Sequence, residues 1–139
     1  MKKRRAVIDT NVLRAGLYSS TGASYQILRL IEQGRLIPLL STALLFEYEE
    51  IIRRHQTELD LTYSEIDDVL DGFCVRGECR IIHFLWRPAL TDPKDDHILE
   101  LAVAAGNADI VTHNRSDFGA ASKFGIRVIS PATLLGEMK

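Results

Sequence analysis

Short apolar runs alternate along this chain with longer segments whose apolar residues recur at helical spacing, and this alternation limits the folds open to it. The expected strands lie at 4–9, 36–41, 79–85, 109–114 and 126–130. The expected helices lie at 21–35, 42–56, 62–77, 92–108 and 131–138. Strands that alternate with helices predict a three-layer α/β/α domain with a central, mainly parallel sheet.

Two local signals refine these boundaries. Pro38 lacks the backbone N–H that a central strand donates, so it makes part of the second run a weaker strand candidate. Ser64 stands where a side-chain oxygen could cap the helix at 62–77.

Composition excludes several classes of protein. With 139 residues, of which 46% are hydrophobic and 26% charged, the chain suits one folded domain and is too apolar for a disordered protein. The formal net charge of −2 gives no indication that the protein binds nucleic acid or a membrane surface. No segment approaches the ~20 apolar residues of a membrane span, and the first residues lack the apolar stretch of a secretion signal. We therefore expect a cytoplasmic protein with no membrane partner.

Acidic residues follow the expected strands at their carboxyl ends, where α/β sheets bind ligands. Asp9 ends the first buried run, and a dry, unpaired carboxylate there would cost several kcal/mol. Glu47 lies within an otherwise apolar helical pattern and is expected on its inner side. The other acids near this edge are Asp92, Asp95, Asp96 and Asp117.

Each acid taken alone has an ordinary structural alternative, such as a helix cap, a dipole partner or an ion pair with an arginine. Together they would repel one another unless a cation or shared protons compensate them. Oxygen ligands without a convergent His or Cys select Mg²⁺ or Mn²⁺. Because such an ion activates water and stabilises charge on phosphate, the natural chemistry is phosphodiester hydrolysis.

The chain resembles the PIN domains, and among them the toxin branch of VapC-type ribonucleases. The resemblance rests on "VIDTNVL", "STALLFEYEEIIRR", "DPKDDHILELAVAAGNADIVTHNRSDF" and "GIRVISPATLL", and it covers nearly the whole chain as one domain, 1–139. It implies a catalytic acidic quartet of Asp9, Glu47, Asp95 and Asp117, with Asp96 as the alternative metal ligand to Asp95. It also implies supporting roles for Asn11, Ser41, Asp92, Thr112 and Asn114.

The resemblance further implies cleavage of single-stranded RNA, a homodimer and control by a small antitoxin protein. Positive side chains near the site are candidates to hold the RNA backbone, namely Arg14, Lys94 and Arg115. Tyr18 and Trp86 could stack on bases, with core packing as the alternative for Trp86.

Two other classes of function stay open from the sequence. A phosphotransfer or phosphatase-type α/β domain also places Asp at a strand end, but it has no evident need for Glu47. A PIN-fold module could instead bind RNA or a partner without cutting, although loss of an acid from the quartet would be expected there.

Overall fold

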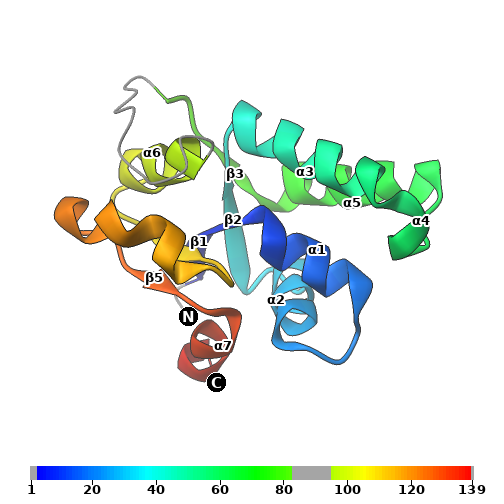
Figure 1. Ribbon diagram of the computed structural model, residues 1–139, viewed down its shortest axis with the longest axis horizontal. Helices are drawn as coiled ribbons and strands as arrows, with labels where there is room; N and C mark the ends of the chain where they lie inside the picture. Colours follow the sequence, from blue (N-terminus) through cyan, green and yellow to red (C-terminus); the bar gives the residue numbers. More distant parts are fainter. Residues whose placement is uncertain (1–2, 83–94, 139) are drawn as a thin grey trace.

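The computed structural model describes residues 3–82 and 95–138, and helices flank a central sheet (Figure 1). The strands are β1 (Arg4–Ile8), β2 (Leu36–Leu40), β3 (Glu78–Cys79), β4 (Asp109–Val111) and β5 (Val128–Ile129). The helices are α1 (Thr10–Tyr18), α2 (Ala23–Glu32), α3 (Thr42–Arg54), α4 (Gln56–Leu59), α5 (Tyr63–Arg76), α6 (Asp96–Ala104), the 3₁₀ segment η2 (Arg115–Phe124) and α7 (Pro131–Met138). The predicted three-layer α/β/α architecture is confirmed.

All the strand pairs are parallel, in the order β3-β2-β1-β4-β5. Strand β1 is the centre of the sheet and pairs with β2 on one side and β4 on the other. Its residues Ala6, Val7 and Ile8 are fully buried, which explains the apolar run at the start of the sequence. Because the strands are parallel, the residues that follow them meet at one edge of the sheet.

The helix that follows Asp9 was absent from the sequence prediction. Asp9 is the N-cap of α1, and its side chain accepts a hydrogen bond from the backbone N–H of Thr10. The alternation pattern missed α1 because this helix follows the strand without an intervening loop.

The third strand is shorter than predicted. Only Glu78 and Cys79 pair with β2, whereas Ile81 is 78% exposed, and residues 83–85 lie outside the described part of the chain. The physical reason is that β2 ends at Leu40, where Ser41 begins the next helix, so few residues of β2 remain to pair.

Two boundary predictions were also wrong. Pro38 does not weaken β2, which runs unbroken from Leu36 to Leu40, because β3 pairs only with Leu39 and Leu40 and requires no N–H from Pro38. The cap of α5 is Thr62 rather than Ser64. The Thr62 hydroxyl accepts from the Glu65 backbone, and the Glu65 carboxylate accepts from the Thr62 backbone, which forms a capping box.

A close backbone approach at the end of α5 requires glycine. A Cβ on Gly77 would lie 2.6 Å from the Phe73 carbonyl oxygen and 2.8 Å from the Pro38 carbonyl oxygen, whereas a Cβ on Gly72 would meet nothing closer than 3.8 Å. We expect Gly77→Ala to lower the free energy of unfolding by about 1–3 kcal/mol, and Gly72→Ala, inside the helix, to raise it by about 0.5–1 kcal/mol. Urea denaturation of both variants would measure this, and equal effects would contradict the packing at Gly77.

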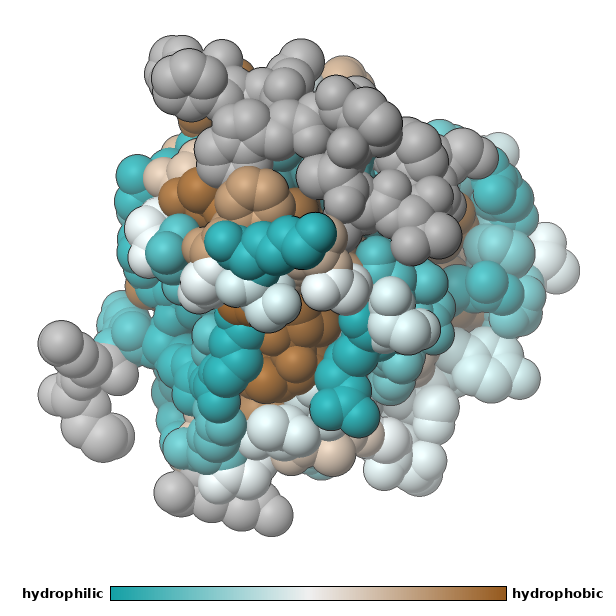
Figure 2. All heavy atoms as spheres, turned by 60° about the vertical axis from the view of Figure 1, so that its left-hand side comes forward, coloured by the Kyte–Doolittle hydropathy of each residue, from teal (hydrophilic) through white to brown (hydrophobic). Residues whose placement is uncertain are grey.

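Among the described residues, no helix combines the length and apolar character needed to cross a membrane. Figure 2 turns toward the viewer the left-hand side of Figure 1, where α6 lies. The described surface seen there is mostly hydrophilic, with hydrophobic residues near its centre.

Candidate functional site

A pocket of about 640 Å³ opens at the edge of the sheet where β1 ends. Its lining comes from segments far apart in the sequence: the start of α1, one face of α3, the start of α6 and the start of η2 (Figure 1). The residues that line it are Asp9, Thr10, Asn11, Arg14, Ala43, Phe46, Glu47, Glu50, Ile51, Arg54, Asp95, His97, Asn114 and Asp117. The fold therefore brings all four acids of the expected quartet to one pocket.

Asp9 is the most buried of these four acids, with 7% of its surface exposed. One carboxylate oxygen accepts from the Thr10 backbone N–H at 2.8 Å, and the other accepts from the Thr112 hydroxyl at 2.7 Å. Burial is the main cause that raises the pKa of Asp9 above its ordinary value, and the nearby Glu47 carboxylate raises it further, while the hydrogen bond from Thr112 opposes the shift.

The Thr112 hydroxyl connects Asp9 to the polar turn after β4. It donates to Asp9 and accepts from the Asn11 side-chain amide at 3.2 Å and from the Asn114 backbone N–H at 3.1 Å. Asn11 in turn accepts from the His113 backbone N–H at 3.2 Å. Asn11 is thus linked to Asp9 through Thr112, which is completely buried.

Helix α3 holds Glu47 opposite Asp9. Its N-cap, Ser41, accepts from the Leu44 backbone N–H at 3.1 Å, and the buried Tyr48 hydroxyl donates to the Ile8 carbonyl at the end of β1. This second bond ties the residue after Glu47 to the residue before Asp9. Ser41 therefore supports the site through the helix and does not line the pocket.

The Glu47 carboxylate is held by side chains from two further helices. One oxygen accepts a hydrogen bond from the Thr10 hydroxyl, and the other lies 3.1 Å from His97 Nε2. The His97 Nδ1 atom is buried and has no hydrogen-bond partner within the described ranges 3–82 and 95–138. Glu47 faces the pocket, in contact with the start of α1 rather than with the sheet itself.

The structure separates the two candidate acids at the start of α6. Asp95 lines the pocket and makes no side-chain capping bond to the helix, which argues against a cap as its role. Asp96 is 1% exposed and is not part of the pocket lining. Asp117 lies in the first turn of η2 and lines the pocket. Two other predicted residues, Asp92 and Lys94, lie outside the described residues.

The donor set suits a hard divalent cation. The four acids offer oxygen ligands, and the positive charge of an ion would offset both the burial of Asp9 and its repulsion by Glu47. As the side chains lie, no group of three or more His, Cys, Asp or Glu residues in the described part of the chain is arranged to hold a metal ion. Small side-chain movements at the pocket would therefore accompany ion binding.

The predicted RNA-contacting arginines differ in their positions. Arg14 lines the pocket and forms an ion pair with Glu58 at 3.1 Å. Arg115 is exposed at the start of η2 but does not line the pocket. The exposed side chain of Tyr18 lies outside the pocket lining as well, and Trp86 is outside the described residues.

Three residues of this site were not identified from the sequence, namely Thr10, Phe46 and Tyr48. A helical-spacing signal was available for Phe46, because it shares a face of α3 with Glu47 and Glu50. Nothing in the local sequence distinguishes Tyr48 from an ordinary core residue. Its hydroxyl bond to Ile8 depends on how α3 packs across the end of β1.

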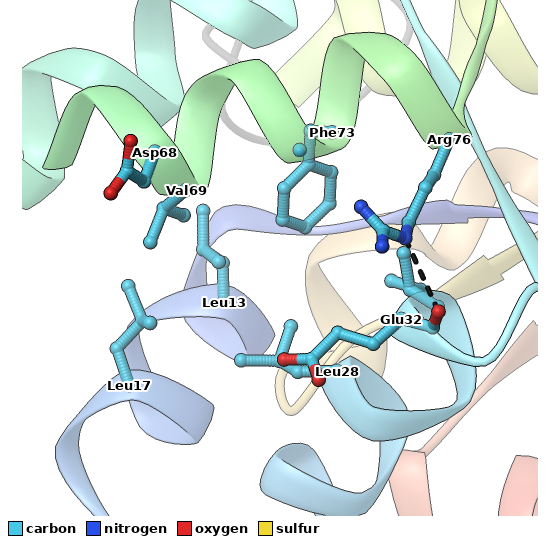
Figure 3. A pocket seen from close by; sticks show the side chains of 10 residues that line it. Leu13, Leu17, Leu28, Glu32, Asp68, Val69, Phe73 and Arg76 are labelled. Carbon is cyan, nitrogen blue, oxygen red and sulfur yellow. Dashed lines mark hydrogen bonds between the residues drawn. The ribbon is translucent and has the colours of Figure 1, made fainter. Parts of the chain in front are cut away.

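A second pocket, of about 340 Å³, has a different character. It lies between α1, α2 and α5 and is lined mainly by apolar side chains such as Leu13, Leu17 and Phe73 (Figure 3). Arg76 closes one end by donating to the Glu32 backbone carbonyl at 3.2 Å. None of the four acids lines this pocket, so it offers no comparable chemistry.

Comparison with known proteins places this chain in a family. A family model described as "PIN domain" matches residues 5–116, from β1 to the start of η2, and this range contains Asp9, Glu47 and Asp95 but ends one residue before Asp117. No curated protein matches the chain. PIN domains are generally nuclease domains. The match covers most of the chain and agrees with the parallel sheet flanked by helices, so the chain belongs to the PIN domain family.

Proposed function

We propose that this protein is an endoribonuclease that uses Mg²⁺ or Mn²⁺ to hydrolyse phosphodiester bonds in single-stranded RNA. The observation that carries the proposal is that Asp9, Glu47, Asp95 and Asp117, from four separate segments, line one pocket. Hydrogen bonds from Thr112, Thr10 and His97 satisfy two of these carboxylates, but the repulsion between Asp9 and Glu47 persists, and a cation would offset it.

The four acids are the residues that would hold the ion. When bound, it would lower the pKa of a water molecule and stabilise negative charge on the phosphate. Thr112 and Thr10 keep the Asp9 and Glu47 carboxylates in place by donating hydrogen bonds to them. His97 fixes the second oxygen of Glu47, and Arg14 places positive charge at the pocket wall.

The proposal extends to a toxin that forms a homodimer and is held inactive by a small antitoxin. This part is supported by the resemblance of "VIDTNVL" and "STALLFEYEEIIRR" to the VapC-type branch.

The test is cleavage of labelled single-stranded RNA and DNA by purified protein in Mg²⁺, Mn²⁺ or EDTA. We expect RNA cleavage in either ion and none in EDTA, because the carboxylates alone supply no activated water. An Asp9→Asn protein purified in parallel controls for contaminating nuclease. Cleavage that survives EDTA, or that the variant retains, would contradict the proposal.

A further inference from the structure

Phe46 is an exposed aromatic residue at the wall of the acidic pocket. Its side chain is 66% exposed, and it does not belong to the hydrophobic core that the described residues form. The core side of α3 is made by Leu44, Tyr48 and Ile52, which are fully buried. Leaving a phenyl ring in water is unfavourable, and the packing of this helix does not require the ring.

The ring lies on the one face of α3 that borders the pocket. This face consists of residues at helical spacing, namely Ala43, Phe46, Glu47, Glu50, Ile51 and Arg54. It extends about 16 Å along the helix from the first to the last of them. Phe46 therefore adjoins Glu47 both in the sequence and at the pocket.

The charges of the pocket do not favour a polyanion. Its lining holds five carboxylates and two guanidinium groups, and both arginines already pair with acids: Arg14 with Glu58 and Arg54 with Glu50. An RNA chain that crosses this pocket would be repelled by most of the ionised groups along its described walls. The bound ion would attract the phosphate at the acids, and stacking of a base on an aromatic ring would add an attraction that does not depend on charge.

We infer that Phe46 is a base-stacking subsite, where an unpaired RNA base packs on the ring next to the phosphate that the ion bound by the acids would hold. The inference rests on the proposed function and adds to it the reason for a single-stranded substrate. Bases in a duplex are paired and stacked on their neighbours. An unpaired base can turn out of the stack and pack on the ring.

The test compares RNA binding by the wild type, Phe46→Ala, Phe46→Tyr and Tyr63→Ala. Tyr63 is the matched control, because it is also an exposed aromatic residue, 70% exposed, and lies outside the pocket lining. Binding of a labelled 12-nucleotide RNA is measured in Ca²⁺, which also binds carboxylate oxygens, and the RNA is checked on a gel to be uncut. We expect Phe46→Ala to weaken binding between about 5-fold and about 100-fold, and Phe46→Tyr and Tyr63→Ala to bind like the wild type.

A second measurement asks whether the ring contacts a base. The same RNA is made with a single abasic position, moved along the chain. One position should weaken binding to the wild type strongly and leave binding to Phe46→Ala unchanged, since the ring and its base form one interaction. A duplex of the same sequence should bind the two proteins alike.

The outcomes separate this inference from the proposed function. If the wild type binds and cuts RNA and Phe46→Ala does the same with equal affinity, the stacking subsite is wrong while the ribonuclease stands. If the wild type neither binds nor cuts RNA, both fail. If Phe46→Ala instead changes only the molecular mass measured by light scattering, the ring covers a second copy of the chain and the inference is overturned.

Discussion

Asp9→Asn is expected to reduce RNA cleavage at least about 100-fold while the protein stays folded. Loss of groups that only orient a metal ligand costs about 10- to 100-fold, so loss of a ligand itself should cost more. Asn keeps the shape of the side chain but offers one oxygen in place of two. The measurement is the initial rate of cleavage at a fixed Mn²⁺ concentration, alongside the thermal midpoint of unfolding.

Two opposing effects should leave the stability of Asp9→Asn close to that of the wild type. Because burial raises the pKa of Asp9, its ionised form destabilises the folded protein above that pKa, and the amide removes this cost. The amide also loses an acceptor toward either the Thr10 backbone or the Thr112 hydroxyl, which costs about 1–3 kcal/mol.

The control for Asp9→Asn is Asp71→Asn, which changes an exposed carboxylate of α5 outside the pocket. It should cleave RNA at the wild-type rate. A folded Asp9→Asn protein that cleaves RNA at the wild-type rate, or equal losses in both variants, would contradict the assignment of Asp9 to the site.

The fold was predictable where burial dominates. The runs around Val7, Leu39 and Ile110 are apolar throughout, which predicts strands buried on both faces. Because these runs alternate with helices, they predict a parallel sheet. The short β3 was not predictable from its own residues. Its length is set by where β2 ends, and that boundary depends on the Ser41 cap of the following helix.

The acids of the site were predictable, because a carboxylate at the end of a buried strand demands compensation, and Asp9 and Asp117 both follow strands. The side chains that hold them were harder to predict. Thr10 contacts Glu47 across 37 positions of sequence, and His97 contacts the same carboxylate across 50. Contacts of this kind arise from the packing of α1, α3 and α6 around the pocket, which helical periodicity does not encode.

Glu47→Gln is expected to weaken metal binding while the protein stays folded. The neutral amide removes the repulsion between Glu47 and Asp9 but loses one acceptor toward Thr10 or His97, so the thermal midpoint of the metal-free protein should stay close to that of the wild type. Ser41 and Tyr48 continue to hold α3 in place, because neither of their hydrogen bonds involves the Glu47 side chain. The same variant should bind Mn²⁺ about 100-fold more weakly, since it removes one charged ligand from a shared site.

The response of stability to Mn²⁺ decides whether Glu47 is a ligand. At a Mn²⁺ concentration 100 times the wild-type Kd, the ion should stabilise the wild type by about 2.7 kcal/mol, and a variant that binds 100-fold more weakly should gain only about 0.4 kcal/mol. Glu49→Gln is the control, because Glu49 lies on the same helix, outside the pocket lining, and pairs with Arg53 at 3.0 Å. It should respond to Mn²⁺ like the wild type. If Glu47→Gln and the wild type gain equal stability from Mn²⁺, Glu47 is not a ligand and the ion would have to be held by the other acids of the pocket.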